Sequence, residues 1–347
     1  MDSPARMTSG DRRAGERLLD IIDRFANLRL VVVGDCVADE FIYGRVARIS
    51  REAPVLILEY DSTQILPGGA GNAANNAASL GARTYAFGYV GRDEIGARLL
   101  AGFHPRVETS GLIPIPGFRT PSKTRVLAGG VHATKQQIVR IDRLTNQLPV
   151  ASVRTRMRSR LARALARCDG VLVSDYGFGL SSPSLVAEIK KTLAPRRVPI
   201  LIDSRYHLDR YRGLTACTPN QAEVERLVGR TIDHDPRALE RAGRELLTRT
   251  RMAAVLVTRG SRGMALFQPG RATIHIPIFG TDEVADVTGA GDTVIAAMTQ
   301  ALAAGASFAD AARLANYAGG IVVMKRNTAT VSADELRRAV RMDLADR

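Results

Sequence analysis

Short, mostly apolar runs that end in polar residues recur along this chain, and they constrain its fold more than any other feature. The runs are rich in valine, isoleucine and leucine, and the four clearest span residues 28–33, 170–173, 199–202 and 254–257. Such a run is typical of a strand that is buried on both faces of a parallel sheet. Segments with helical spacing separate the runs. The sequence therefore predicts one large α/β domain over residues 26–340, with a mostly parallel central sheet and helices on both faces.

Acidic side chains stand at the ends of several of these runs. Asp35, Asp175 and Asp203 each follow a predicted buried strand. The carboxyl ends of parallel strands lie at the same edge of a sheet, and ligands bind at that edge. We therefore expect the functional site there, with Asp35 facing a ligand.

Two further pairs of short strands interrupt the α/β pattern. Residues 41–60 look like two strands around a charged bend at 45–52, and residues 119–142 look like two strands joined by Gly129-Gly130. We expect these segments to form a small β lid. Exposed strand edges tend to pair with other chains, so the lid could cover a site or join a second subunit.

The net charge of +14 invites a nucleic-acid interpretation, but the distribution of the charge argues against it. Apolar residues recur at helical spacing through the arginine-rich stretch 153–168, which places most of its arginines on a solvated helix face. Aromatic residues make up only 5% of the chain, and no zinc-finger or RNP-like segment occurs. An anionic small substrate explains the charge equally well, so we expect no nucleic-acid partner.

The sequence predicts neither membrane insertion nor secretion. Its apolar runs are far shorter than the roughly 20 residues that cross a bilayer. The basic leader, residues 1–25, lacks the apolar stretch of a signal peptide, and we expect it to be poorly ordered. Cys36, Cys168 and Cys217 are widely spaced and odd in number, which fits a reducing cytoplasm, and their spacing is not that of metal ligands.

Residues 286–293, with the sequence Asp-Val-Thr-Gly-Ala-Gly-Asp-Thr, precede an apolar helical run. Gly289, Ala290 and Gly291 allow the backbone to turn tightly and to approach a ligand closely. The free N–H groups at the start of the following helix suit a phosphate. Asp292 falls in the first helical turn. It could simply balance the charge of the helix end, but its glycine-rich setting favours an anion hole with a general base at its rim.

Other nucleotide-binding motifs are weak or missing. Residues 69–74 match the loose dinucleotide fingerprint, and Asp93 lies at a tolerable distance for a ribose-binding acid. However, the preceding strand ends near Tyr60, too far upstream for the tight turn that this fingerprint requires. The chain has no P-loop sequence. Asn220 and Glu223 could form only a capping box at a helix start.

Taken together, these segments resemble the ribokinase-like (PfkB) sugar kinases over nearly the whole chain. The segment 286–293 is the most specific motif of that family. Gly68-Gly69 with Asn72, the segment 220–223 and Thr258-Arg259-Gly260 occur in the order that the family shows. The resemblance implies a three-layer ribokinase-like fold with a small β lid, and a homodimer formed through that lid.

Within the family, the chain is most similar to the kinases of D-glycero-β-D-manno-heptose 7-phosphate. The matching stretches are Gly34-Asp35 with Asp39, Tyr43-Gly44, 48–50, 52–55, Lys123 with 125–127, Gln136-Gln137, Arg140 with Asp142, 174–176, 210–213 and 330–332. Three places depart from that pattern. Phe178 stands where lysine is usual, Ser204-Arg205 replaces Pro-Lys, and Arg51 replaces proline.

The resemblance implies a reaction and a set of cofactors. ATP would phosphorylate the anomeric hydroxyl of the heptose 7-phosphate, giving the 1,7-bisphosphate for ADP-heptose and the lipopolysaccharide core. Asp292 would remove the hydroxyl proton, and the N–H groups of residues 289–292 would hold the transferring phosphoryl group. ATP would carry Mg²⁺, and the resemblance leaves room for a monovalent cation.

The resemblance also implies the binding residues. The nucleotide would contact Asn220, Glu223, Thr258, Gly260, Gly263 and Asn316, with Glu223 reaching Mg²⁺ through water. The sugar hydroxyls would contact Asp35, Gly68, Gly69 and Asn72. The candidates for holding the distal phosphate of the sugar are Arg48, Lys123, Arg125 and Arg140.

Alternatives remain open because the three departures lie near the expected substrate edge. The chain could be a PfkB-type kinase of ribose, fructose or a fructose phosphate. More remote alternatives are an NAD-dependent enzyme and a sugar-binding protein without catalytic activity. Turnover of ATP with a panel of sugars distinguishes these cases.

Overall fold

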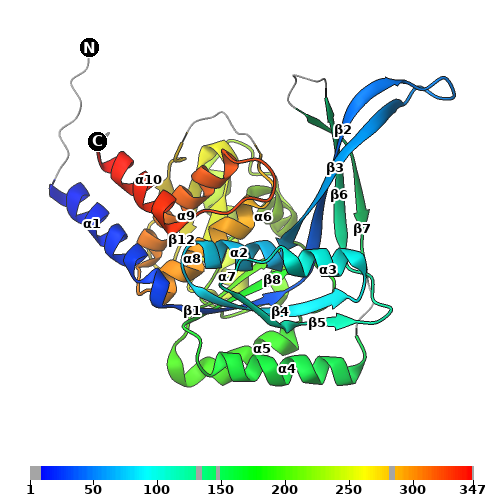
Figure 1. Ribbon diagram of the computed structural model, residues 1–347. Coiled ribbons are helices and arrows are strands. Elements are labelled where there is room, and N and C mark those ends of the chain that lie inside the picture. Colours follow the sequence, from blue (N-terminus) through cyan, green and yellow to red (C-terminus); the bar gives the residue numbers. More distant parts are fainter. Residues whose placement is uncertain (1–8, 130–134, 146–148, 281–285, 346–347) are drawn as a thin grey trace, which may run out of the picture.

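A large, mostly parallel sheet forms the centre of the molecule (Figure 1). The computed structural model describes residues 9–129, 135–145, 149–280 and 286–345. Within these residues, nine strands pair in the order β13-β12-β11-β10-β9-β8-β1-β4-β5, and only β12 and β13 run antiparallel to their neighbours. In that order the strands span Ile274–Ile276, Met264–Phe267, Ala254–Thr258, Ala216–Cys217, Ile200–Ser204, Gly170–Asp175, Arg29–Gly34, Arg83–Gly91 and Val107–Ile115.

Helices cover both faces of this sheet, which confirms the predicted three-layer α/β architecture. On one face lie α1 (Ser9–Asp23), α2 (Ala70–Ser79), α3 (Glu94–Ala101), α8 (Ala290–Ala303), α9 (Phe308–Val323) and α10 (Ala333–Ala345). On the other face lie α4 (Ala151–Leu165), α5 (Pro183–Leu193), α6 (Gln221–Val228) and α7 (Pro236–Thr250). Short 3₁₀ turns occur at Phe25–Asn27, Ala194–Arg196, Leu208–Arg210 and Gly260–Arg262.

The central strand β1 explains why an apolar run predicts this arrangement. Successive side chains of a strand point to opposite faces. Leu30 and Val32 therefore join the core on the α8 side, whereas Val31 and Val33 join the core on the α4 side. Because both faces are covered by helices, all four side chains are apolar and almost fully buried.

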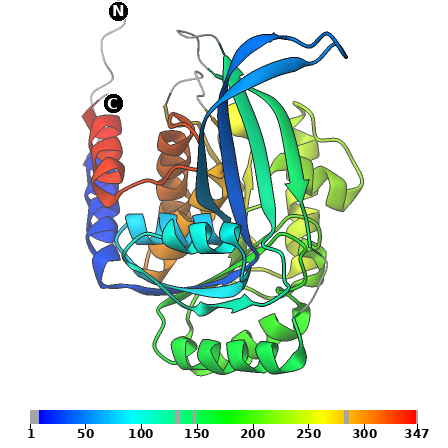
Figure 2. The ribbon, with the colours of Figure 1, turned by 45° about the vertical axis from the view of Figure 1, so that its right-hand side comes forward.

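The β lid is a separate four-stranded sheet that stands away from the main body (Figures 1 and 2). Its order is β3-β2-β6-β7, with β2 at Cys36–Ile49, β3 at Leu56–Gly69, β6 at Ser122–Gly129 and β7 at Gln136–Arg143. β2 pairs antiparallel with β3 and parallel with β6. The segments predicted for the lid therefore do share one sheet.

The position of the bend between the first two lid strands was predicted wrongly. The charged residues 45–49 belong to β2, and pairing with β3 continues to Ile49 and Leu56. Charges are tolerated in this part of the strand because the ribbon is exposed and the charges pair across it. Arg45 lies 3.6 Å from Glu59 and 3.3 Å from Asp61. The turn therefore falls at residues 50–55.

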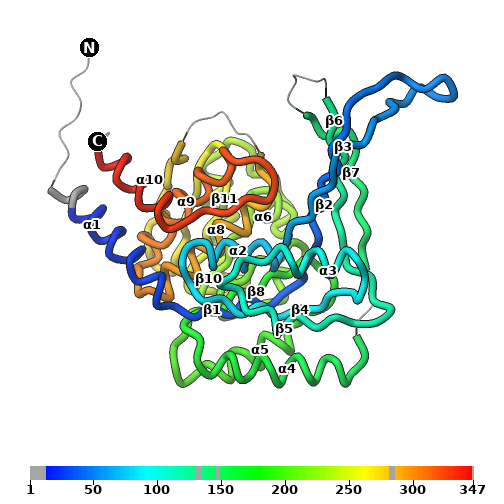
Figure 3. Tube along the Cα trace, viewed as in Figure 1, coloured from blue at the N-terminus to red at the C-terminus, as the bar shows by residue number. Residues whose placement is uncertain are grey.

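The expectation of a poorly ordered leader is also wrong for the part of it that the structure describes. Residues 9–23 form α1, which lies beside α10 (Figures 1 and 3). Leu18, Ile21 and Ile22 are buried in the core, and Arg17 pairs with Asp310 at 3.0 Å. The apolar residues are few, but they lie on one face of the helix. Residues 1–8 lie outside the described part of the chain.

Candidate active site

The glycine-rich turn begins α8 beneath the lid. Gly289 adopts a φ of 77°, and a Cβ atom there would lie 2.3 Å from Nδ2 of Asn72. A residue other than glycine would therefore be strained and would collide with Asn72. Among the described residues, the backbone amides of Gly291 and Asp292 have no hydrogen-bond acceptor, whereas that of Ala290 donates to Val287 O. The free amides at the helix start can bind an anion.

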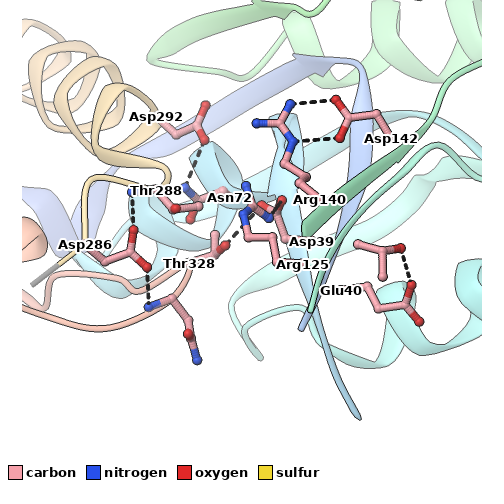
Figure 4. A network of polar contacts seen from close by, with 12 residues as sticks. Asp39, Glu40, Asn72, Arg125, Arg140, Asp142, Asp286, Thr288, Asp292 and Thr328 are labelled. Carbon is pink, nitrogen blue, oxygen red and sulfur yellow. Dashed lines mark hydrogen bonds and ion pairs between the residues drawn. The ribbon is translucent and has the colours of Figure 1, made fainter. Parts of the chain in front are cut away.

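Asp292 is buried directly beside these amides, and two side chains fix its carboxylate, of which Figure 4 labels Asn72. Asn72 Nδ2 donates to Oδ2 at 2.9 Å, and the Tyr176 hydroxyl donates to Oδ1 at 3.1 Å. Burial raises the pKa of Asp292 to about 7, although the two hydrogen bonds by themselves lower it. A carboxyl with a pKa near neutrality can accept and release a proton at physiological pH.

Asn72 is itself held in one orientation. Asn76 Nδ2 donates to Asn72 Oδ1 at 2.9 Å, and the Thr293 hydroxyl donates to Asn76 Oδ1 at 3.0 Å. The amide oxygen of Asn72 is thereby occupied, so its NH₂ group must face Asp292. All three residues are buried, and they connect α2 to α8.

A cavity of about 440 Å³ extends from Asp292 along the carboxyl ends of the strands. Its lining includes every residue that the sequence predicted for the nucleotide: Asn220, Glu223, Thr258, Gly260, Gly263 and Asn316. Gly289, Ala290 and Gly291 line it as well. The structure thus brings the predicted base, the anion hole and the predicted nucleotide residues to one cavity.

Local structure explains why these nucleotide candidates lie at the cavity. Asn220 and Glu223 form a reciprocal capping box at the start of α6, with both hydrogen bonds at 2.9 Å. Gly263 has a φ of 70°, and a Cβ atom there would lie 2.1 Å from Ile276 O. The buried Asn316 of α9 donates to Pro277 O at 2.9 Å.

The cavity offers two carboxylates as candidates for a metal site. Asp203 and Glu223 both line it. Burial raises the pKa of each carboxyl, and for Asp203 the charge of Glu223 acts in the same direction. Within the described residues, no three acidic, histidine or cysteine side chains form a metal-binding cluster. Two oxygen donors fit Mg²⁺, which usually keeps several waters and needs only one or two carboxylates.

The predicted sugar-binding residues lie on the lid side of Asp292. Asp35 is buried, and its Oδ2 accepts backbone hydrogen bonds from Tyr176 at 2.9 Å and Phe178 at 3.1 Å. Burial raises the pKa of Asp35 to about 6. Gly68 and Gly69 end β3, and a Cβ atom at Gly68 would lie 2.2 Å from the Asp39 carboxylate. Asn72 lies one helical turn beyond them.

The structure gives the predicted phosphate-binding cations different surroundings, although Arg125 and Arg140 lie opposite each other on β6 and β7. Arg125 is buried and donates to Asp39 at 2.7 Å, so its charge is already neutralised (Figure 4). Arg140 is exposed and forms two hydrogen bonds with Asp142, at 2.7 and 2.6 Å. Lys123 is half-buried, and burial lowers its pKa against the attraction of Asp39.

Arg48 lies far from the other three cations. It is exposed near the tip of the β2–β3 ribbon. Nine residues of strand separate it from Asp39, and at ~3.3 Å per residue this is roughly 30 Å. The structure therefore does not bring Arg48 to the site of its own chain.

Sequence reasoning missed several residues that shape the site. Asp39 holds Arg125 and accepts a hydrogen bond from the Thr328 hydroxyl at 3.0 Å. Tyr176 contacts Asp292, and Arg205 lines the cavity. These three residues lie in segments that carry or border the family resemblance. No local sequence pattern, however, predicts what they contact. Their partners come from distant parts of the chain.

Comparison with solved structures identifies the fold. The fold matches Arabidopsis thaliana ribokinase complexed with ribose and ATP, with a TM-score of 0.68 and 22% identity over 91% of this chain and 98% of that one. It also matches Escherichia coli phosphofructokinase-2 in complex with potassium, with a TM-score of 0.70 and 17% identity over 92% and 99% of the two chains. The predicted ribokinase-like fold is therefore confirmed.

The family is established by sequence. The pattern of the pfkB family of carbohydrate kinases matches residues 27–335, and the chain belongs to this family. It is accordingly an ATP-dependent sugar kinase. None of the described helices has the length and hydropathy needed to cross a membrane.

Curated relatives narrow the similarity further. The chain is 39% identical to the bifunctional protein HldE of Trichlorobacter lovleyi over 338 residues, and 41% identical to that of Geobacter metallireducens over 312 residues. The matches cover 97% and 89% of this chain, but 67% and 62% of the two relatives. The chain thus spans about two thirds of the length of these relatives.

Proposed function

We propose that the protein transfers the γ-phosphoryl group of ATP to the anomeric hydroxyl of D-glycero-D-manno-heptose 7-phosphate. The product is the 1,7-bisphosphate, a precursor of ADP-heptose and the lipopolysaccharide core. The kinase chemistry rests on one observation: the buried Asp292 lies beside free helix-end amides at a cavity lined by the nucleotide candidates. The choice of sugar rests on the similarity to the HldE proteins and on the matching sequence segments.

In the proposed reaction Asp292 is the general base. Its carboxylate accepts the proton of the sugar hydroxyl while that oxygen forms the new bond to the γ-phosphorus and ADP leaves with the electrons of the broken P–O bond. The amides of Gly291 and Asp292 donate to the phosphoryl oxygens, on which negative charge is concentrated. Asn72 orients the carboxylate in the free enzyme. It would also contact a sugar hydroxyl beside Asp292.

The nucleotide would lie in the rest of the cavity. Asn220, Thr258, Gly260 and Gly263 would line its phosphate and ribose end, and Asn316 would lie near the adenine. Mg²⁺ bound with ATP supplies charge neutralisation, and Glu223 would hold it through water, with Asp203 beside it. A monovalent cation is a further proposed component, since the similar phosphofructokinase-2 structure is a complex with potassium.

In the sugar-phosphate complex, Lys123 and Arg140 would bind the distal phosphate, and Arg125, a candidate from the sequence, would not. Asp35, Gly68 and Gly69 would contact the sugar hydroxyls. The ion pair between Arg125 and Asp39 is buried, and opening it to bind substrate would leave a carboxylate without its partner. Arg140 is half-exposed, so it can exchange Asp142 for a phosphate at much lower cost.

We further propose a homodimer formed through the β lid. The lid exposes many large apolar side chains: Val46, Ile49, Val55, Leu56, Tyr60, Ile138, Val139 and Ile141. Exposed apolar side chains in such number on one small sheet favour an interaction site. In such a dimer Arg48 would be too far from the site of its own chain and could contact only the site of the partner.

The kinase domain, proposed at 26–340, would also include α1, because α1 shares the core with α8 and α10.

The cytoplasm is the proposed compartment because the reaction consumes ATP. The three cysteines agree with a reducing environment, since all are buried free thiols.

A substrate screen tests the proposed function. ATP consumption is measured with heptose 7-phosphate, unphosphorylated heptose, fructose 6-phosphate, fructose and ribose, and the product is identified by ³¹P NMR. We expect the highest kcat/KM with heptose 7-phosphate and a new anomeric phosphate signal. A preference for ribose or fructose would refute the heptose assignment and leave the kinase class intact. Absence of turnover with every sugar would instead favour a sugar-binding protein.

A further inference from the structure

Tyr176 contacts the proposed base, although the proposed reaction gives it no role. It is the first residue after β8, and its backbone N–H donates to Asp35 Oδ2 at 2.9 Å. This hydrogen bond fixes the backbone of the turn. The side chain points to the other side of the site, where its hydroxyl donates to Asp292 Oδ1 at 3.1 Å.

The ring of Tyr176 is confined by two strands of the lid. The Lys123 ammonium on β6 lies 4.6 Å from the ring centroid, within the range of a cation–π interaction. At the end of β3, a Cβ atom on Gly69 would lie 3.2 Å from Cε2 of the ring. Gly69 has a φ of 57°, so glycine there both allows the turn and makes room for the ring.

We propose that Tyr176 is a positioning residue that connects the lid to the base. Its hydroxyl fixes the orientation of the Asp292 carboxylate, and its ring holds the Lys123 ammonium in the charged surroundings of that carboxylate. The inference rests on the proposed role of Asp292 in the reaction.

The hydrogen bonds explain why both donors are needed. Asn72 holds Oδ2 of Asp292 at 2.9 Å, and Tyr176 holds Oδ1. With one donor on each oxygen, the carboxylate cannot rotate about its Cβ–Cγ bond without losing both. The second lone pair of an oxygen stays available for the sugar hydroxyl. A base misplaced by about 1 Å can cost roughly a hundredfold in rate.

The charges around Asp292 come from several elements. Burial has the largest effect on the pKa of Asp292. The charge of Asp39 on β2 also raises this pKa, whereas the charge of Lys123 on β6 lowers it. Asp203 at the end of β9 faces Asp292 from the cavity side. The hydrogen bonds from Asn72 and Tyr176 favour the ionised form. Removing only the Tyr176 hydroxyl should therefore raise the pKa of Asp292.

The test measures this pKa directly and does not depend on turnover. The carboxyl carbons of aspartate are labelled with ¹³C, and Asp292 is assigned by the signal that Asp292→Asn removes. Tyr176→Phe should raise the pKa of Asp292 by about one unit, the scale of a hydrogen bond to a charged group. Tyr176→Leu should raise it further, because Lys123 then loses the ring beneath its ammonium. Unchanged titration in both variants would overturn the proposal.

A second arm tests Lys123 and separates positioning from folding. Lys123→Met keeps the tyrosine and should also raise the pKa of Asp292; no shift would mean that the ring does not hold the ammonium near the base. In kinetic assays, Tyr176→Phe should move the acidic limb of kcat to higher pH by the NMR shift. An equal loss of kcat at every pH with an unshifted limb would indicate a merely structural role. Failure of the proposed function appears separately, as missing turnover by the wild-type enzyme.

Discussion

At the scale of single residues, burial determines the behaviour of Asp292. Its pKa is raised to about 7 in the folded chain, against an ordinary value of ~3.9. The folded state therefore binds the proton more tightly than the unfolded state. Consequently the cost of burying the charge grows as the pH rises from about 4 to about 7 and is constant above that.

This pH-dependent cost of burying the charge predicts how Asp292→Asn changes the free energy of unfolding. The neutral side-chain amide of the variant avoids this cost, and the Tyr176 hydroxyl can accept a hydrogen bond from the NH₂ group of that amide. We expect the variant to exceed the wild type in free energy of unfolding by about 1–4 kcal/mol at pH 8, since one pKa unit corresponds to ~1.4 kcal/mol. The difference should shrink as the pH approaches 4. Denaturant titrations at pH 5 and pH 8 measure it, and a difference that grows toward acid pH would contradict the assigned pKa.

Arg125 on β6 and Arg140 on β7 lie on neighbouring lid strands and provide a matched pair for a second prediction. Arg125→Ala leaves Asp39 buried without its partner, and we expect it to lower the free energy of unfolding by about 3–5 kcal/mol. Arg140→Ala removes an exposed partner of Asp142 and should change stability by less than about 1 kcal/mol.

The kinetic effects of the two variants should also differ. Arg140→Ala should raise KM for the phosphorylated sugar by about tenfold or more, the scale of a charged hydrogen bond, and should leave unphosphorylated sugars unaffected. Steady-state kinetics and thermal melts distinguish the two residues. If Arg125→Ala kept full stability and lost only phosphosugar binding, the phosphate site would have to include Arg125.

The residues of the glycine turn were predictable because their signal is local. Glycine spacing before an apolar helix places Gly289, Gly291 and Asp292 without knowledge of the rest of the fold. The role of Arg125 was not predictable in this way. It depends on the parallel pairing of β2 with β6, which brings Asp39 beside Lys123 and Phe41 beside Arg125. No local pattern specifies that register.

At the scale of elements, the lid combines a buried base with an exposed ribbon. Its strands are longer than the apolar pattern indicated, because cross-strand charge pairs continue the pairing where apolar residues stop. α1 was missed for a related reason. Three buried apolar side chains among many charges are enough to dock a helix on a neighbouring helix, but they are a weak signal in the sequence.

The lid yields a third prediction. Ile49 is 66% exposed near the tip of the ribbon, and an aspartate there should disrupt an apolar dimer interface. We expect Ile49→Asp to sediment as a monomer with an unchanged melting temperature. Met342→Asp, at a residue of α10 that is 61% exposed and distant from the lid, is the matched control and should remain dimeric. A wild-type chain that is monomeric at micromolar concentration in light scattering would refute the lid dimer.

At the scale of the whole molecule, the main sheet and the lid meet at Asp292. The sheet supplies the proposed nucleotide cavity at its carboxyl edge, and the lid brings Lys123 and Arg140 to the other side of Asp292. The sequence predicted this division because each buried strand ends in a polar residue at the same edge. It did not predict which charges face each other, since that depends on how the two sheets are placed in space.

The account depends most on Asp292 as the base of a sugar kinase. The most direct measurement compares the wild type with Asp292→Asn at pH 8, following anomeric phosphate formation from ATP and heptose 7-phosphate by ³¹P NMR and ATP affinity by calorimetry. Removing a general base should lower kcat by roughly 10²–10⁴-fold while the Kd for ATP stays within a few-fold. If the variant kept a kcat within a few-fold of wild type, the base would lie elsewhere and the account would be wrong.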